Sequence, residues 1–262
     1  MNKIKHWITA DWPAPANIHA LTTLRTGGVS QDTFFSLNPA NHVNDDNDRV
    51  NKNRQIISDM LQLPSEPVWL DQIHGNQAVE AIETGVLKSA DASYTAKSGV
   101  VCAIMTADCL PLLICSSDGL HVAAIHAGWR GLLTGVIANT IMALEISYNV
   151  SSSRGDFRDN FDFRDNLLVW LGPAIGPNCF EVGSEVRDAY LVKSLEFASA
   201  FKEQASDKWL ADIYKLARIE LAFLGVNNVY GGTHCTFTEQ EQFYSYRRDK
   251  QTGRMATLIW RE

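Results

Sequence analysis

Three short stretches of the chain carry side chains that can bind a metal ion or act as nucleophiles. They are Gln72-Ile73-His74-Gly75, Thr106-Ala107-Asp108-Cys109 and His126-Ala127-Gly128-Trp129-Arg130-Gly131. Each follows a run of apolar residues, so each is expected at the end of a β-strand. Loops at strand ends on one side of a sheet commonly converge on a functional site. We therefore expect His74, Cys109 and His126 to lie close together.

One thiolate and two neutral imidazoles form a ligand set that suits Zn²⁺. Three protein ligands leave the fourth tetrahedral position open for water or substrate, as in catalytic zinc sites. Zinc in such a site lowers the pKa of its bound water to about 7 and polarises a substrate atom. The chain contains no CxxC or HxxxH pair, so spacing alone does not decide the assignment.

The same residues allow other interpretations. Cys109 can be a nucleophile with His126 as its base, because a thiolate beside a protonated histidine is the usual form of an activated cysteine. Cys179 or Cys235 can complete the tetrahedron, which would make the zinc site structural. Cys109 can also be a small buried side chain. Metal dependence and coordination number separate these alternatives.

Apolar runs predict the strands that position these residues. The predicted strands are His19–Arg25, Pro67–Ile73, Gln77–Ile82, Val100–Thr106, Leu110–Cys115, Leu120–His126, Leu167–Leu171, Asn228–Tyr230 and Met255–Trp260. The three close-set runs within residues 100–126 are expected to be central strands. The turn chemistry of Ser116-Ser117-Asp118-Gly119 predicts a hairpin between the last two.

Helices are predicted at Asp48–Leu61, Leu132–Ile146, Ser184–Leu195 and Ser206–Leu224, the last of them ending at Gly225. Strands and helices therefore mix without strict alternation. This order favours a layered α/β or α+β sandwich over a TIM barrel or a doubly wound sheet. The chain also lacks GxGxxG, Walker and HExxH motifs, so it offers no sign of the common nucleotide-binding folds or of a zincin.

Composition indicates an ordinary globular protein. The chain has 262 residues, 45% hydrophobic and 20% charged, which is enough to bury a substantial core, and one domain is the default expectation. The net charge of -7 and the absence of a basic stripe argue against nucleic acid as a partner. Five cysteines, an odd number spread thinly along the chain, argue against a disulfide framework.

The distribution of apolar residues along the chain predicts neither a signal peptide nor a membrane-spanning helix. The segment from Met1 to Trp12 contains Lys3, Lys5 and Asp11 and lacks the apolar run of a signal peptide. No later stretch reaches the roughly 18 apolar residues of a membrane helix. We expect a cytoplasmic protein without a membrane partner, either a monomer or a weak homo-oligomer.

Residues 151–166 contain a tandem duplication. DFRDNF at 156–161 is followed directly by DFRDNL at 162–167. Polar, repetitive segments rarely build sites, so we interpret residues 151–166 as an exposed loop insertion without a catalytic role.

Five motifs give the chain a family resemblance. DQIHGN at 71–76, TADCLPLLI at 106–114, HAGWRGL at 126–132, LGPAIGPNCFEV at 171–182 and FYSYRRDKQTGR at 243–254 resemble the motifs of the laccase-domain family, also called YfiH-like or polyphenol oxidase. The resemblance spans nearly the whole chain and preserves the order of the motifs.

The resemblance implies a single domain that folds as a four-layer α/β/β/α sandwich with mixed sheets. It implies zinc ligands at His74, Cys109 and His126. It further implies a purine nucleoside phosphorylase that acts on adenosine, inosine and methylthioadenosine and also deaminates adenosine. The family is associated as well with copper-dependent polyphenol oxidation and with peptidoglycan editing, so a cysteine hydrolase using Cys109 and His126 on a cell-wall amide stays an alternative.

The residues themselves argue against one of these names. A multicopper laccase binds part of its copper through paired HxH motifs, whereas this chain has seven histidines and no HxH. Copper can still occupy a single N/S site in vitro, because Cu²⁺ binds such ligands more tightly than Zn²⁺.

Phosphorolysis requires an anion site, and deamination requires a proton shuttle. Arg25, followed by Gly27-Gly28, is one candidate phosphate cradle. Arg247 is a second anion-binding candidate, and Gln72 is a further substrate-binding candidate. Asp108, beside Cys109, is the candidate shuttle, because the cytidine-deaminase HxE and PCxxC signature is absent.

Overall fold

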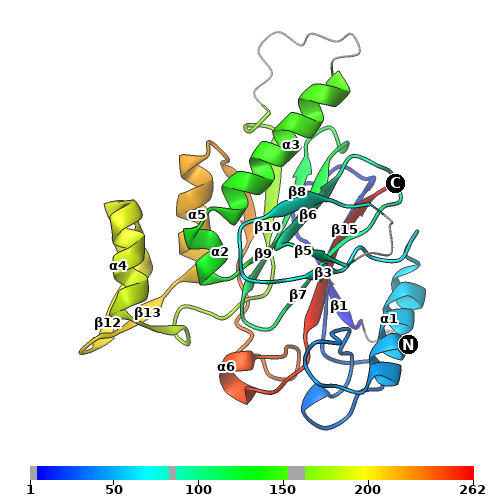
Figure 1. The fold of residues 1–262 in the computed structure, drawn as a ribbon, viewed down its shortest axis with the longest axis horizontal. Coiled ribbons are helices and arrows are strands. Elements are labelled where there is room, and N and C mark those ends of the chain that lie inside the picture. The colour runs from blue at the N-terminus through cyan, green and yellow to red at the C-terminus, as the bar shows by residue number, and fades with distance from the viewer. Residues whose placement is uncertain (1–4, 83–86, 153–162) are drawn as a thin grey trace.

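Two β-sheets stack at the centre of the molecule, with helices on both outer sides (Figure 1). The computed structural model describes residues 5–82, 87–152 and 163–262. The four-stranded sheet has the order β1 (Trp7–Thr9), β2 (Ile18–Thr23), β15 (Met255–Arg261) and β7 (Cys102–Thr106). The six-stranded sheet has the order β14 (Asn228–Gly231), β10 (Leu167–Leu171), β8 (Leu110–Ser116), β9 (Val122–Ala127), β6 (Ala92–Thr95) and β4 (Ala78–Glu80).

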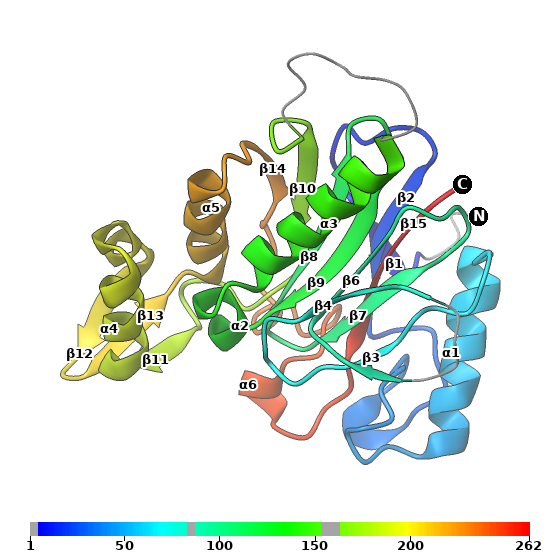
Figure 2. The ribbon, with the colours of Figure 1, turned by 45° about the horizontal axis from the view of Figure 1, so that its top comes forward.

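Helices complete the outer layers. Helix α1 (Asn47–Leu61) covers the four-stranded sheet, whereas α3 (Val136–Ser152) and α5 (Ile213–Phe223) cover the six-stranded sheet (Figure 2). The pairs β10–β14 and β4–β6 are parallel and the other pairs within these two sheets are antiparallel. The predicted four-layer α/β/β/α sandwich with mixed sheets is therefore confirmed.

Three apolar cores hold the four layers together. Between the sheets, Ile104 and Ile259 pack in one cluster with Leu113 and Trp170. The second core lies between the outer face of the six-stranded sheet and helices α3 and α5. The third lies between the outer face of the four-stranded sheet and α1, and it includes Ile57. Strands β8 and β9 are buried along their whole length, which explains why their sequences are apolar without alternation.

Local signals in the sequence set several boundaries. The Asp46 side chain accepts a hydrogen bond from the Arg49 N–H and caps α1, and Gln62, just after the last helical residue, has the left-handed conformation that ends the helix. Ser116 donates to Asp118, and Gly119 has a φ of +70°, so the predicted hairpin between β8 and β9 is confirmed.

The remaining elements are short or peripheral. They are α2 (Trp129–Leu133), α4 (Ser184–Lys193), α6 (Tyr246–Asp249), the 3-10 turns at Asp32–Phe34 and Leu195–Ala200, the pair β3 (Leu70–Asp71) and β5 (Lys88–Ser89), and the sheet of β11 (Glu181–Gly183), β13 (Lys208–Ala211) and β12 (Phe201–Ala205). The small sheet and α4 form a lobe beside α5 (Figure 1).

Several sequence predictions differ from the structure. The helix predicted at Ser206–Leu224 begins only at Ile213, because residues 208–211 pair as β13 and Asp212 caps the helix by accepting from the Lys215 N–H. The strands predicted at Pro67–Ile73 and Gln77–Ile82 shrink to β3 and β4. Strand β7 is not central, because it forms the edge of the four-stranded sheet while β8 and β9 lie in the other sheet.

Most of the predicted loop insertion, residues 153–162, lies outside the described residues. At its borders, α3 runs to Ser152, and Phe163 is buried in the core outside the six-stranded sheet. Phe163 packs against Tyr148 of α3 at a ring-centroid distance of 4.8 Å.

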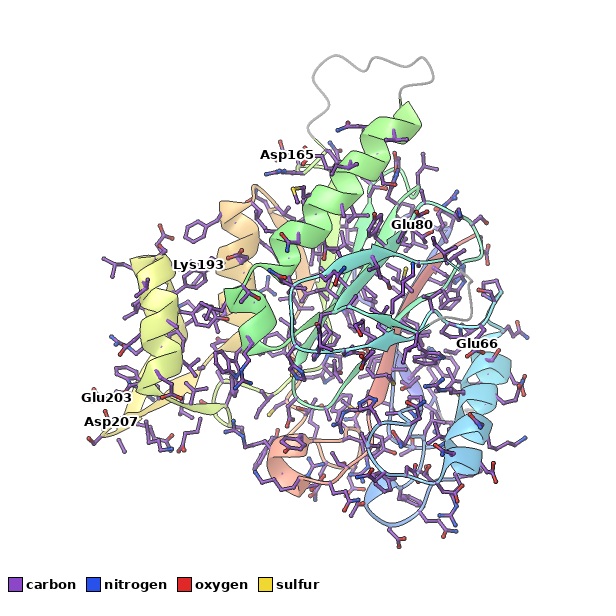
Figure 3. All side chains as sticks on the ribbon, in the orientation of Figure 1. Glu66, Glu80, Asp165, Lys193, Glu203 and Asp207 are labelled. Carbon is purple, nitrogen blue, oxygen red and sulfur yellow. The ribbon has the colours of Figure 1, made fainter. Side chains whose placement is uncertain are left out.

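The charge of the surface is dispersed. Glu66, Glu80 and the β12–β13 hairpin, which carries both Glu203 and Asp207, lie on separate parts of the fold (Figure 3). No helix within the described ranges combines the length and the apolar character needed to cross a membrane.

Candidate metal centre and adjoining cavity

Cys109 lies where the chain passes from one sheet to the other. The chain leaves β7 at Thr106, turns at Asp108 with a φ of +92°, and enters β8 at Leu110. The Asp108 carboxylate stabilises this turn by accepting hydrogen bonds from the Thr236 hydroxyl and from the backbone N–H of Arg247, both at 2.6 Å. The sheet crossing thus exposes the Cys109 thiol between segments that are distant in sequence.

His126 enters the same space from β9, beside the start of β8. Its backbone N–H donates to the carbonyl of Asp91, and its Nδ1 lies 2.7 Å from Asp91 Oδ1. Both side chains are buried, with exposed fractions of 3% for His126 and 0% for Asp91. Since Nδ1 donates to this carboxylate, Nε2 is left for the metal, as in carboxylate–histidine–zinc arrangements.

His74 comes from the loop that follows β3. Its φ is +59°, an unusual conformation for a residue with a side chain, and Asp91 stabilises it. Asp91 Oδ1 accepts from the His74 N–H at 3.0 Å and Oδ2 accepts from the Gly75 N–H at 2.6 Å. One buried carboxylate therefore orients both histidines.

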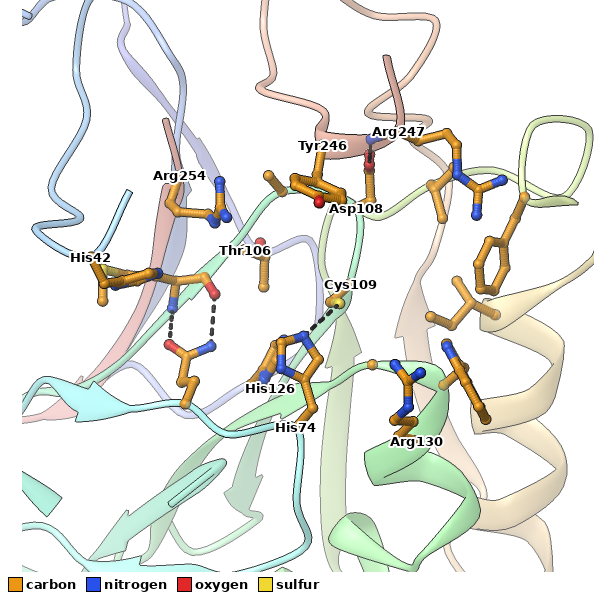
Figure 4. Close-up of a pocket in the computed structure, with 18 residues that line it drawn as sticks. His42, His74, Thr106, Asp108, Cys109, His126, Arg130, Tyr246, Arg247 and Arg254 are labelled. Carbon is orange, nitrogen blue, oxygen red and sulfur yellow. Dashed lines mark hydrogen bonds between the residues drawn. The ribbon is translucent and has the colours of Figure 1, made fainter. Parts of the chain in front are cut away.

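The structure brings the three predicted ligand residues together (Figure 4). One ligand atom from each of His74, Cys109 and His126 lies within 4.8 Å of the others, and Cys109 Sγ is 3.9 Å from His74 Nε2. Two imidazole nitrogens and one sulfur at this spacing fit a tetrahedral Zn²⁺ with one position open. Within the described residues, neither Cys179 nor Cys235 joins this cluster.

Electrostatics favour the ionised thiol. Burial raises the pKa of Cys109, but the charge and hydrogen bonds of His126 and His74 outweigh this effect and bring the pKa to about 6. Burial lowers the pKa of His126, but Cys109 and Asp91 raise it to about 9. The metal-free pair is therefore thiolate and imidazolium at neutral pH, so metal binding to His126 would release a proton.

A cavity of about 450 Å³ opens in front of the three ligand residues. Its wall combines cations with aromatic and apolar side chains. The lining includes His42, Gln72, Asp108, Trp129, Arg130, Phe180, Ile213, Tyr246, Arg247 and Arg254. Three arginines thus surround a site with few free negative groups, which suits an anionic ligand beside an aromatic one.

The predicted substrate-binding residues have different positions. Arg247 lines the cavity, although its Nη1 donates to the carbonyl of Glu181. Gln72 also lines it, but its amide bridges the backbone N–H and carbonyl of Met105, which ties the β3 loop to β7. Arg25 lies outside this cavity. Its guanidinium donates to the carbonyls of Phe35 and Gln240.

Sequence reasoning missed several residues of the site, including most of its aromatic lining and four polar residues. Arg130 and Arg254 stood inside motifs that carried the family resemblance, which was the available signal. Asp91, between Ala90 and Ala92, could have been noticed as a carboxylate in an apolar setting. His42 carried no signal, because only the folding of the loop before α1 brings it to the cavity.

A sequence profile described as "Multi-copper polyphenol oxidoreductase laccase" matches residues 19–262. The chain belongs to this laccase-domain family. The membership agrees with the fold and with the His–Cys–His cluster, while the described residues contain one such cluster and no second one for further metal ions.

Relatives within the laccase-domain family are named as enzymes of nucleoside metabolism. The chain is 50% identical to a purine nucleoside phosphorylase of Pseudomonas aeruginosa, over 97% of this chain and 98% of the relative. It is 48% identical to the purine nucleoside phosphorylase YfiH of Escherichia coli, with the same two coverages.

Solved structures of the family share the whole fold. A Neisseria meningitidis protein of the DUF152 family superposes with a TM-score of 0.90 at 47% identity, covering 98% of this chain and all of the other. YlmD from Geobacillus stearothermophilus superposes with a TM-score of 0.87 at 27% identity, covering 100% of this chain and 98% of YlmD.

Proposed function

We propose that this protein is a zinc-dependent purine nucleoside phosphorylase that acts on adenosine, inosine and methylthioadenosine. The observation that carries the proposal is the open His74–Cys109–His126 cluster facing a cavity with three arginines. The names of relatives at 40–50% identity support the same class of enzyme.

In this proposal, the three arginines of the cavity bind the phosphate. Arg254 is partly buried, and burial lowers its pKa although the negative charges of Cys109 and Asp108 act to raise it. Arg130 is exposed at the rim and stacks over Trp129 at 4.3 Å. Arg247 lies over Phe180 at 5.6 Å. Guanidinium groups bind phosphate through paired, charge-assisted hydrogen bonds, so together they provide an anion site.

The aromatic side of the cavity suits a purine. Trp129, Phe180 and Tyr246 provide flat apolar surfaces, and Ile213 adds an aliphatic one. The volume of about 450 Å³ lies within the range of about 300–1,000 Å³ that small-molecule sites occupy. Stacking on these rings would hold the base while leaving the ribose towards the cluster.

In the proposed reaction, a phosphate oxygen bonds to C1′ of the ribose and the bond from C1′ to the base nitrogen breaks. The base leaves with the electron pair and takes up a proton. The arginines hold the phosphate at the distance needed for attack, and the aromatic residues orient the base. Zinc bound by His74, Cys109 and His126 would supply Lewis-acid polarisation of a nucleoside atom.

We also propose adenosine deamination as a side activity of the same site. The three-residue cluster supports it, since a zinc ion held by His74, Cys109 and His126 would supply activation of a water nucleophile. Both oxygens of Asp108 already accept hydrogen bonds, from Thr236 and the Arg247 N–H. We therefore assign Asp108 a positioning role first, and a shuttle role only if one of these bonds opens.

The proposal is tested by chromatography of adenosine and inosine after incubation with zinc-replete protein. We expect free base and ribose 1-phosphate only when phosphate is present, and loss of both products in His74→Ala. Inosine formed from adenosine without phosphate would report the deaminase activity. Intact inosine in a phosphate-containing, zinc-replete sample would refute the phosphorylase.

A second candidate function is supported by one contact. Cys109, His126 and Asp91 form a nucleophile, a base and an orienting carboxylate, the arrangement of a cysteine hydrolase. Such an enzyme, including one that edits peptidoglycan, would keep its activity after chelation and lose it after thiol alkylation. The second histidine beside Cys109 has no role in that triad, and this favours the metal site.

Copper at the same cluster is the remaining alternative, as in a copper-dependent polyphenol oxidase. The ligand set would bind Cu²⁺ in vitro. Oxidase activity that appears only after copper loading and disappears when zinc is restored would then reflect the exchanged metal.

A further inference from the structure

Cys179 and Cys235 flank a single glycine outside the metal cluster. Cys235 pairs with Ala174 in a short parallel bridge, and its Sγ accepts a hydrogen bond from the Gly176 N–H at 3.2 Å. Cys179 closes the turn that begins at Gly176, because its own N–H donates to the Gly176 carbonyl at 3.0 Å. Both cysteines are thus held by the same backbone unit.

Gly176 permits this close approach. A Cβ atom at this position would lie 3.0 Å from both Cβ and Sγ of Cys235, which is tighter than ordinary packing. Because residue 176 has no side chain, the Cys235 sulfur packs directly against the backbone of the turn that Cys179 closes.

The two thiols differ in acidity. Burial raises the pKa of Cys235, but hydrogen bonds from Thr238 and from the N–H groups of Gly176 and Phe237 outweigh it, so the pKa is lowered. Burial raises the pKa of Cys179, and the neighbouring Cys235 raises it further. Cys235 is therefore the better thiolate of the two.

Accessibility separates this pair from the core cysteines. Cys179 and Cys235 are partly exposed, whereas Cys102 and Cys115 are fully buried and burial raises the pKa of each to about 12. Oxidation follows thiolate character and exposure. The two partly exposed thiols outside the metal cluster are thus the ones open to an oxidant.

We propose that Cys179 and Cys235 form a peroxide-reactive dithiol that is oxidised to a disulfide. The Cys235 thiolate attacks one oxygen of a hydroperoxide, the O–O bond breaks, and the leaving oxygen takes up a proton. The Cys179 sulfur then attacks the Cys235 sulfenic acid, the S–O bond breaks, and water leaves with the Cys179 proton. Two electrons pass from the thiols to the peroxide.

The disulfide would link two segments that border the nucleoside cavity. Phe180, next to Cys179, lines the cavity, and Thr236, next to Cys235, donates to Asp108. The chemistry itself requires neither nucleoside nor phosphate. The dithiol can therefore be tested independently of the proposed phosphorylase activity.

The test treats zinc-replete full-length protein with hydrogen peroxide, alkylates the remaining thiols in denaturant and maps the peptides by mass spectrometry. We expect two of the five thiols to disappear, a crosslinked peptide pair containing Cys179 and Cys235, and full recovery with dithiothreitol. Five free thiols after treatment, or oxidation confined to Cys109, would overturn the proposal.

Variants assign the two roles. In Cys179→Ser we expect the Cys235 sulfenic acid to persist and to be trapped by dimedone, whereas in Cys235→Ser we expect Cys179 to stay reduced. Cys115→Ser is the matched control at a buried cysteine and should keep the disulfide. Equal oxidation of Cys179 with and without Cys235 would contradict the assignment.

Discussion

At the scale of single residues, Asp91 explains why the cluster has its geometry. Its carboxylate contacts Nδ1 of His126 and the backbone N–H groups of His74 and Gly75. Burial raises the pKa of Asp91, but the hydrogen bonds and charge of His126 and the N–H groups of residues 74 and 75 outweigh it and lower the pKa. Asp91 therefore stays ionised and holds two ligand segments together.

Replacing Asp91 with Asn tests this positioning role. The variant keeps all three ligands but loses the negative acceptor for Nδ1, so we expect zinc affinity to fall about 10–100-fold. Competition with a chromophoric chelator measures the change. Asp71→Asn, which removes an exposed carboxylate bonded to Ser89, is the control and should leave zinc affinity unchanged.

The pKa of Cys109 makes a second residue-scale prediction. Only the thiolate reacts with iodoacetamide, and the Cys109 pKa is about 6. In chelated protein, the alkylation rate of Cys109 should therefore rise as pH increases through about 6 and level off well below pH 9. Cys102 should stay unmodified throughout, and added zinc should protect Cys109. A rate still rising steeply between pH 8 and 9 would contradict this ionisation.

The sequence predicted the candidate metal-ligand residues better than the residues that position them. His74, Cys109 and His126 were identifiable because metal-competent side chains followed apolar strands. Asp91 was not, because its role depends on backbone N–H groups that only the His74 turn directs towards it. Arg25 stays a prediction: a guanidinium beside two glycines suits phosphate, and in the fold this guanidinium donates to the carbonyls of Phe35 and Gln240, outside the cavity at the cluster.

At the scale of elements, the short helix α2 and the loop that follows β3 position the ligand residues of the cluster. Helix α2 begins directly after the ligand-bearing strand β9, and its Gly131 packs against the loop that carries His74. A Cβ at residue 131 would approach the Gly75 carbonyl oxygen to 2.8 Å. This contact couples the position of α2 to that of His74.

Gly131→Ala is therefore expected to affect both folding and metal binding. Overpacking of this kind costs about 1–3 kcal/mol of unfolding free energy, and displacement of the His74 loop should weaken zinc binding measurably. Chemical denaturation and chelator competition report the two effects. Gly225→Ala is the matched control, because its φ of +78° makes alanine strained while no atom lies within 4 Å. It should lower stability but leave zinc affinity unchanged.

Element boundaries were predictable where local chemistry set them. Gly119 marks the turn of the β8–β9 hairpin, as predicted, and α1, predicted from Asp48, begins at Asn47 after its cap Asp46. Residues 206–212 read as helical, yet 208–211 form β13, because pairing with β11 and β12 outweighs local propensity. The passage of the chain from one sheet to the other at Asp108 was also not predictable, because no local sequence pattern shows whether two successive strands belong to the same sheet or to different sheets.

At the scale of the whole molecule, the site lies where residues from the four-stranded sheet meet residues from the side of the six-stranded sheet. Arg254 precedes β15 of the four-stranded sheet, whereas Arg130 lies in α2 on the side of the six-stranded sheet. Cys109 lies between them, at the crossing. The four-layer order was implied by the family resemblance alone, and the mixed order of strands and helices predicted only a layered sandwich. The convergence of the arginines required the assembled fold.

The anion site can be tested by charge removal. Losing a charge-assisted hydrogen bond costs about 1.5–3 kcal/mol, so Arg254→Gln should raise the KM for phosphate about 10–100-fold while changing the KM for inosine less. Arg25→Gln is the comparison, because Arg25 lies outside the cavity. If Arg25→Gln raised the KM for phosphate as much as Arg254→Gln does, the phosphate site predicted at Arg25 would be supported instead.

In the proposed reaction, one metal ion at His74, Cys109 and His126 is required for phosphorolysis. The most direct test adds zinc in steps to chelated protein and measures ribose 1-phosphate formed from inosine and phosphate. We predict that the rate rises linearly to one zinc per chain and then stays constant, and that His74→Ala shows no such rise. Full activity in protein shown by metal analysis to be zinc-free would contradict the account.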